Sequence, residues 1–530
     1  MNTNIWCADL GNGFYRNPIL YADYSDPDAI RVGDDYFMIA SSFCNTPGVP
    51  LLHSKDLVNW KVVNYIWQNV PEERYAKPIH GCGAWAPAIR YHDGVYYAFI
   101  PMPDEGIYVS KTTDPFGVWD EPFNLRPGAG WIDPCPFWDE DGRAYMVAGV
   151  AKSRIGYKSV LHIVEMKPDA SALIGEEIKV FDGNENNQET IEGPKLYKRN
   201  GWYYIFAPAG GVKVGWQTVL RSRNIYGPYE YKDVKRQCET KINGPHQGAW
   251  VTTQTGEDWF LHFQDVYAAG RITHLQPMTW LDNDWPIIGI QVPDCEYGEP
   301  VYEYAKPDVG CSYPPCEPAA ADDFMSDKLG LQWQWNANEG NNWYSVGNGK
   351  LKLNCIANDN PMLLSELPNL LIQKWPAPEF TCQVKMNFSN IGEGDYAGLV
   401  NMGMLYSGLM VTKKDSHFAL LAVSGEQKFS GTEWSTTELS NELLTTVDCE
   451  SITLRYTVQC IGQRDINKKE TNFPYEKVTL SYSINGERFV DAITVDAKPG
   501  RWVGTKMGMF AASANADSTA YAEFENFDFI

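Results

Sequence analysis

The amino-acid sequence predicts an all-β protein: a five-bladed β-propeller followed by a concanavalin-like β-sandwich. Three observations support this fold class: a pattern that occurs five times before residue 265, a proline-rich segment after residue 306, and short β-type segments from residue 322 onward. We expect a propeller over residues 1–305, a linker over residues 306–321 and a sandwich over residues 322–530. A chain of 530 residues is too long for one hydrophobic core, so several domains are expected.

The repeated pattern is a short apolar run, a tight turn and a second run that is rich in aromatic residues. Its turns contain Gly33, Gly94, Gly142, Gly201 and Gly256, which are roughly 50–60 residues apart. Glycine beside an acid or Asn, between β-type runs, is a strong hairpin signal because glycine accepts a positive φ. A repeat of this length is typical of a propeller with one blade for each copy.

One residue with a functional side chain precedes each turn. These residues are Asp26, Trp85, Asp133, Glu192 and His246. Because they occupy equivalent places in the repeat, we expect them at the same end of five inner strands, around one mouth of the central channel. A single acid near a turn is usually structural, as we interpret Asp28, Asp34 and Asp35, but three acids in matching phase favour a shared site.

Three carboxyl groups around one hollow suit the hydrolysis of a glycosidic bond. One group protonates the leaving oxygen, and another attacks the sugar or activates a water molecule. A third, negatively charged group helps to keep the acid protonated. If acid and base are about 6.5–9.5 Å apart, a water fits between them and the product is inverted.

Composition excludes several other classes of function. A net charge of −23 argues against binding to nucleic acid or to an anionic membrane surface. No apolar run is long enough to span a bilayer, and no signal peptide is recognisable, so we expect a cytoplasmic protein or an exported one whose signal has been removed. The 12 cysteines form no zinc-type spacing; Cys311 and Cys316 could pair in an oxidising compartment, although free thiols are favoured.

Eight short segments carry a family resemblance. They include Trp85-Ala86-Pro87-Ala88, Ile132-Asp133-Pro134 and Ile191-Glu192-Gly193-Pro194, together with residues 17–20, 25–28, 31–38, 47–60 and 270–277. In this order they resemble glycoside hydrolase family 43 over residues 17–305. Residues 322–530 resemble the β-sandwich that follows the propeller in the β-xylosidase-like branch of that family.

The resemblance implies a role for each acid. The family hydrolyses xylosides and arabinofuranosides with inversion. By position, Asp26 resembles the general base, Glu192 the general acid, and Asp133 the carboxylate that orients the substrate and keeps the acid protonated.

The resemblance also implies the surroundings of the acids. Arg271 resembles an arginine that contacts sugar hydroxyls or the acids, and Trp85 and Phe43 resemble apolar walls of the sugar pocket. His246 resembles a histidine that faces the substrate, a water or a structural calcium ion in the channel. Calcium prefers oxygen ligands, so one imidazole is weak support for this metal, and the reaction itself is expected to need no cofactor.

The leading functional hypothesis is an exo-acting β-xylosidase on xylo-oligosaccharides, with or without α-L-arabinofuranosidase activity. The alternatives are a dedicated arabinofuranosidase on arabinoxylan or arabinan side chains, an endo-acting arabinanase, and a non-catalytic glycan-binding propeller. Residues 42–47 lack the second aromatic that β-xylosidases of the family often carry there, which weakens the choice of xylose. A homo-oligomer is compatible with the sequence.

Overall fold

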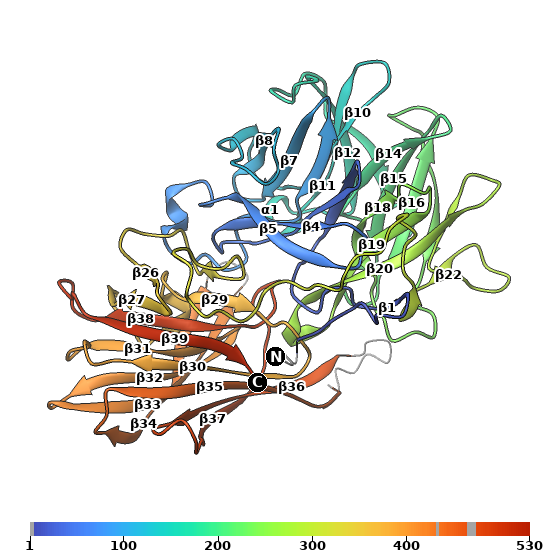
Figure 1. Ribbon diagram of the computed structural model, residues 1–530. Helices are drawn as coiled ribbons and strands as arrows, with labels where there is room; N and C mark the ends of the chain where they lie inside the picture. The colour runs from blue at the N-terminus through green and yellow to red at the C-terminus, as the bar shows by residue number, and fades with distance from the viewer. Residues whose placement is uncertain (1–4, 431–433, 464–472) are drawn as a thin grey trace.

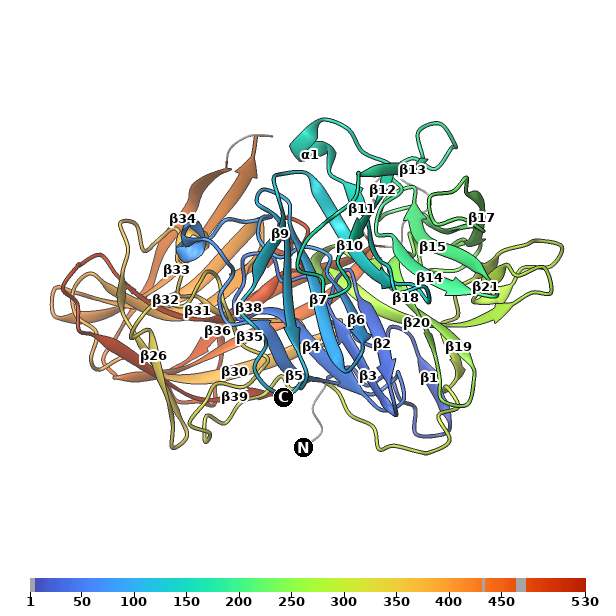
Figure 2. The ribbon, with the colours of Figure 1, turned by 90° about the horizontal axis from the view of Figure 1, so that it is seen from above.

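The structure is a computed structural model that describes residues 5–430, 434–463 and 473–530. It confirms the predicted fold class: a five-bladed propeller beside a β-sandwich (Figures 1 and 2). Each blade has four strands that follow one another along the chain and pair antiparallel.

The first two blades contain β2 (Asp28–Val32), β3 (Asp35–Ile39), β4 (Gly48–Ser54) and β5 (Trp60–Trp67), then β6 (Ala88–His92), β7 (Val95–Met102), β8 (Gly106–Thr112) and β9 (Phe123–Pro127). The third contains β10 (Trp131–Trp138), β11 (Ala144–Val150), β12 (Val160–Met166) and β13 (Ile178–Asp182). The fourth and fifth contain β14 (Lys195–Arg199), β15 (Trp202–Ala209), β16 (Trp216–Ser222) and β17 (Glu230–Lys235), then β18 (His246–Thr252), β19 (Asp258–Asp265), β20 (Arg271–Trp280) and β21 (Pro286–Ile288). The short strands β22 (Ile290–Gln291) and β23 (Gly298–Glu299) extend the fourth blade.

The five predicted turns each join the first and second strands of a blade. Asp93 and Gly94 both have positive φ, as do Asn200 and Gly201, which is the geometry that a two-residue hairpin turn requires. The functional residues identified in the repeat therefore lie at the opposite end of the first strands.

Apolar packing closes the ring between the first and fifth blades. One core cluster joins Tyr36 and Met38 of β3 to Val251 and Leu261 of the fifth blade. A two-stranded sheet of β1 (Phe14–Arg16) and β24 (Glu303–Ala305) brings the two ends of the propeller together.

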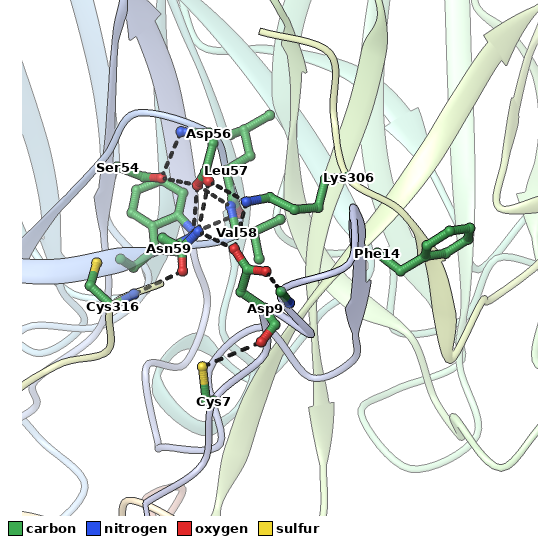
Figure 3. A network of polar contacts seen from close by, with 12 residues as sticks. Cys7, Asp9, Phe14, Ser54, Asp56, Leu57, Val58, Asn59, Lys306 and Cys316 are labelled. Atoms are coloured by element: carbon green, nitrogen blue, oxygen red, sulfur yellow. Dashed lines mark hydrogen bonds and ion pairs between the residues drawn. The ribbon is translucent and has the colours of Figure 1, made fainter. Parts of the chain in front are cut away.

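A buried charge cluster strengthens this closure (Figure 3). The Lys306 Nζ lies 2.6 Å from the Asp9 carboxylate and 2.9 Å from the Asp56 carboxylate. Asn59 donates hydrogen bonds from its amide to both acids, and its carbonyl accepts one from the backbone N–H of Cys316. Segments from both ends of the propeller thus meet at the turn after β4.

Residues 306–321 contain no strand or helix, and Cys316 shows that they run along the first blade. All 12 cysteines lie in the described residues and are free, Cys311 and Cys316 included.

The sandwich consists of two large sheets. One contains β25 (Gln334–Trp335), β29 (Leu371–Lys374), β38 (Lys506–Ser513), β31 (Asp395–Met402), β32 (Leu405–Lys414), β33 (His417–Phe429) and β34 (Trp434–Val447), with β28 (Ile356–Ala357) beside β38. The other contains β26 (Tyr344–Gly347), β27 (Lys350–Asn354), β39 (Tyr521–Phe529), β30 (Phe380–Asn387), β35 (Ser451–Gln463), β36 (Pro474–Ser483) and β37 (Val490–Asp496).

The two domains share part of their core. Val266, Ala268 and Ile272 of the propeller belong to the same buried cluster as the sandwich residues Trp333 and Met507. Figure 1 shows the sandwich packed against one side of the propeller.

Helices are few and short in the described residues: η1 (Glu73–Ala76), α1 (Lys152–Ile155), η2 (Tyr267–Ala269) and η3 (Leu364–Glu366). No described helix has the length and apolar character needed to cross a bilayer.

Candidate active site

The three predicted acids meet at one cavity. Asp26, Asp133 and Glu192 line a hollow of about 340 Å³, together with the predicted residues Arg271, Trp85 and Phe43. Asp26 lies just before β2, Asp133 lies in β10 and Glu192 lies just before β14, so the cavity is at the strand end that the repeat predicts. This volume is near the lower end of the range for ligand pockets and suits a small ligand such as a sugar.

Local backbone geometry turns two of these acids toward the cavity. Asp26 and Asp133 both have a φ of 55°, a left-handed conformation that Asp tolerates better than most residues. The register of β10 against β11 shifts between Ile132 and Cys135, so Asp133 lies in a bulge. Bulges of this kind re-aim a side chain and are frequent next to active sites.

Asp26 is a buried carboxylate surrounded by hydrogen-bond donors. Its Oδ2 accepts from the hydroxyls of Ser41 at 2.6 Å and Ser25 at 3.0 Å. The guanidinium of Arg271 donates to Oδ1 at 2.9 Å and to Oδ2 at 3.2 Å. These donors hold the carboxylate in one orientation, as precise placement of a water molecule beside it requires.

Asp133 has a different environment. It is 2% exposed, and its Oδ2 accepts from the backbone N–H of Gly193 at 2.8 Å and from the Gln247 amide at 3.3 Å. Burial and the negative charge of Glu192 raise the pKa of Asp133 to about 8. Because two close carboxyl groups resist being ionised together, Asp133 keeps a proton beside Glu192 at neutral pH.

His246 lies behind Glu192 and does not line the cavity. Its ring is fully buried, and its Nε2 lies 2.8 Å from Glu192 Oε1. The structure thus differs from the predicted substrate contact: with no exposed surface, His246 positions Glu192 instead.

The predicted calcium at His246 does not fit the residues around it. Its Nε2 is taken by Glu192, and its buried Nδ1 has no hydrogen-bond partner in the structure. Among the described residues, no group of three or more His, Cys, Asp or Glu side chains is arranged to hold a metal ion. Calcium needs six to eight oxygen ligands, which one imidazole does not supply.

The backbone of Arg271 is tied to the sandwich through Asp23, a buried propeller residue that sequence reasoning did not identify. The Asp23 carboxylate accepts from the backbone N–H of Arg271 at 2.9 Å and from that of Gly504 at 2.8 Å. Gly270 has a φ of 82°, and a Cβ there would lie only 2.4 Å from Asp23 Oδ1 and 2.7 Å from the Gly504 Cα. Only glycine therefore permits this close approach of the two domains.

Aromatic rings form the walls of the cavity. Phe43 and Trp85 pack with ring centroids 6.2 Å apart, and Trp85 meets Trp502 edge-on at 4.8 Å. Trp502 belongs to the loop between β37 and β38, so the sandwich supplies part of the wall.

Two known family profiles together match most of the chain. The profile of the glycosyl hydrolases family 43 matches residues 15–286, and that of the beta xylosidase C-terminal concanavalin A-like domain matches residues 321–530. This chain belongs to glycoside hydrolase family 43. A candidate beta-xylosidase of Xylanibacter ruminicola is 40% identical over 420 residues, which cover 78% of the chain and 75% of that protein.

Two further relatives of this family 43 glycoside hydrolase match nearly the whole chain. A non-reducing end alpha-L-arabinofuranosidase of Bacteroides ovatus is 27% identical over 99% of the chain and 97% of its own length. The solved structure of a mutant GH43 protein from Bacillus licheniformis has a TM-score of 0.80 and 25% identity, covering 98% of the chain and 99% of that protein.

Sequence reasoning missed several residues of this family 43 enzyme, among them Asp23, Gln247 and Trp502. Gln247 directly follows His246, and the register of β18 shifts there, so a bulge turns it toward Asp133. Its place in the fifth copy of the repeat was a usable signal. Asp23 and Trp502 make contacts across the domain interface, and the propeller repeat does not predict which residues meet at that interface.

Proposed function

We propose that this chain hydrolyses β-1,4-xylo-oligosaccharides from the non-reducing end, with inversion, and releases the terminal xylose. One observation carries the proposal: three carboxyl groups with contrasting environments line a single sugar-sized cavity. Asp26 is held by an arginine and two hydroxyls, Asp133 is buried with a raised pKa, and Glu192 is partly exposed.

In the proposed reaction, Asp26 activates the attacking water. Its carboxylate accepts a proton from the water while the oxygen attacks the anomeric carbon of the bound sugar. Arg271 and Ser41 keep the carboxylate in one orientation, which reduces the cost of placing the water for attack.

Glu192 donates the proton to the leaving oxygen. Its side chain is 26% exposed, in contrast to the buried Asp133, so it is the acid of the pair that can reach the bond to be broken. Burial and the charge of Glu192 raise the pKa of the neighbouring Asp133 to about 8, so the pair keeps a proton at neutral pH. Asp26 gains one proton and Glu192 gives one, so two carboxyl groups and a water molecule account for every proton in the hydrolysis. We propose that no cofactor takes part.

Exo action is supported by the wall that the sandwich adds. Trp85 and Trp502 from different domains close one side of the cavity, which favours a chain end over an internal segment. The names of the relatives support the same class of substrate, because they include both a candidate beta-xylosidase and a non-reducing end alpha-L-arabinofuranosidase.

A dedicated α-L-arabinofuranosidase is the second candidate. It is favoured by the absence of a further aromatic between Phe43 and Pro47, at the wall of the cavity, and by the full-length match to the Bacteroides ovatus protein. The deciding experiment compares kcat/KM on an aryl β-xyloside and an aryl α-L-arabinofuranoside. We expect the xyloside to be faster; a strong preference for the arabinofuranoside would favour the second candidate.

The Glu192→Ala variant tests catalysis itself. A well-placed general acid contributes about 10²–10⁴-fold, and xylobiose has a poor leaving group, so hydrolysis of xylobiose should fall by about that factor. A circular dichroism spectrum like that of the wild type would show that the fold is kept. Unchanged turnover of xylobiose would remove Glu192 from the mechanism.

A further inference from the structure

Arg501 of the sandwich stacks on Trp502, a residue of the cavity wall, and itself lines a neighbouring hollow together with Phe43. Its guanidinium carbon is 4.1 Å from the centroid of the Trp502 ring and 5.1 Å from that of Phe429, at the end of β33. Two aromatic faces therefore hold the planar group in place, which lowers the entropy that a ligand contact would cost.

The positive charge of Arg501 has no acidic partner among the described residues. No carboxylate lies within ion-pair distance of it, and no hydrogen bond links its guanidinium to another described residue. By contrast, the neighbouring Arg154, which stacks on Trp85, is neutralised by Asp104 at 2.9 Å. Partial burial and the charge of Arg154 lower the pKa of Arg501.

Two lysines of the cavity lining carry further positive charge. Lys152 and Lys158 line the cavity, and neither forms an ion pair with a described residue. The Lys158 Nζ donates to the hydroxyl of Thr190 at 2.7 Å. Figure 2 shows α1, which begins at Lys152, on the same side of the molecule as the ends of β33 and β34.

This arrangement contrasts with the rest of the chain. The protein has a net charge of −23, and the inner cavity holds three acids. Three cations lie near these acids: Lys152 and Lys158 of the cavity lining, and Arg501 behind the cavity residue Trp502; we call these three residues the rim. A neutral sugar needs no such cluster, since hydroxyls can be bound by uncharged groups, whereas an anion gains from every one of these charges.

We propose that the rim formed by Arg501, Lys152 and Lys158 binds a carboxylate on the leaving-group side of the scissile bond. The favoured substrate is then a xylo-oligosaccharide that carries a uronosyl substituent on the residue next to its terminal xylose. The terminal sugar occupies the cavity, the next sugar contacts Trp502, and the guanidinium of Arg501 takes the carboxylate in a bidentate pair. This inference rests on the proposed function and specifies its substrate.

The test compares kcat/KM on xylotriose with kcat/KM on xylotriose bearing a uronosyl group on its second residue. For the wild type we expect kcat/KM to be about tenfold higher on the uronosyl substrate than on xylotriose. This ratio of kcat/KM values should fall as NaCl rises from 0.05 to 0.5 M, because salt screens the charges of the rim. Arg501→Met should lower the ratio about tenfold, and Arg501→Lys should restore part of it. Lys352→Met is the matched control: this lysine also stacks on a ring, Tyr521, but lies on a distant face of the sandwich.

The outcomes are distinguishable. A ratio near one that does not respond to salt would overturn the uronate proposal while leaving xylosidase activity in place, whether or not the Arg501 variants fold. If Arg501→Met lowered kcat/KM equally on both substrates, Arg501 would bind neutral hydroxyls, and the uronate proposal would again be overturned. Absence of hydrolysis of either substrate by the wild type would instead overturn the proposed function.

Discussion

Asp133 carries the proton on which the pH behaviour of the cavity depends. Its pKa is about 8 in the folded protein and near 3.8 in an unfolded chain, because burial and Glu192 disfavour its charge. Between these two values the folded state binds more protons than the unfolded state, so this group costs stability as the pH rises.

The Asp133→Asn variant removes this dependence. The Tm difference between this variant and the wild type should grow in favour of the variant from pH 5 to pH 9. The wild type loses stability over this range as Asp133 is forced to hold or lose its proton, whereas the amide of the variant does not titrate. Differential scanning calorimetry at both pH values measures the effect, and any weakening of the hydrogen bond from Gly193 adds only a pH-independent offset. A Tm difference that stays constant with pH would contradict the raised pKa.

Ser41 tests whether the donors around Asp26 matter for catalysis. Ser41→Ala removes a 2.6 Å hydrogen bond to the proposed base, and bonds to charged groups contribute about 1.5–3 kcal/mol, so kcat/KM should fall at least tenfold. Ser54→Ala is the matched control, because Ser54 also donates to a buried carboxylate, Asp56, but at the other end of the first blade. If both variants lose activity equally, the loss reflects folding rather than the site.

At the level of elements, the loop between β37 and β38 connects the two domains at the cavity. Trp502 forms part of the cavity wall, and Gly504 bonds to Asp23, which also holds Arg271. Trp502→Ala should raise KM for xylobiose about tenfold by removing a stacking surface for the leaving sugar. Steady-state kinetics with Trp138→Ala, an aromatic at the opposite mouth of the channel, provides the control. An unchanged KM in Trp502→Ala would exclude a contact with substrate.

Sequence reasoning predicted the propeller because each blade contains the same local pattern: a strand, a tight turn and a second strand. The turn glycines fix the phase, and the phase brings Asp26, Asp133 and Glu192 to one cavity. The contribution of Trp502 was not predictable, since no local pattern reports which loop of one domain meets another domain. His246 was misplaced because phase along a strand does not reveal whether a ring reaches the surface or stops behind a neighbour.

At the scale of the whole molecule, the closure of the propeller depends on the charge cluster around Lys306 (Figure 3). Asp9 and Asp56 are 4% and 2% exposed at the side chain, and both face the Lys306 ammonium group. Removing one partner of a buried ion pair leaves uncompensated charge and costs about 3–5 kcal/mol.

Lys306→Met should therefore lower the Tm clearly, by opening the junction between the first and last segments of the propeller. Lys350→Met is the control, because the pair of Lys350 with Glu523 is largely exposed and such pairs contribute at most about 1 kcal/mol. Thermal unfolding followed by circular dichroism compares them. Equal shifts in Tm for the two variants would show that the cluster does not hold the ring closed.

The whole molecule is proposed to act as one inverting hydrolase, with acids from three blades and a wall from the sandwich. The most direct measurement of this claim is a proton NMR time course of xylose release from an aryl β-xyloside. The account predicts that α-xylose appears first and mutarotates later, because water attacks from the face opposite the leaving group. Initial release of β-xylose would contradict it.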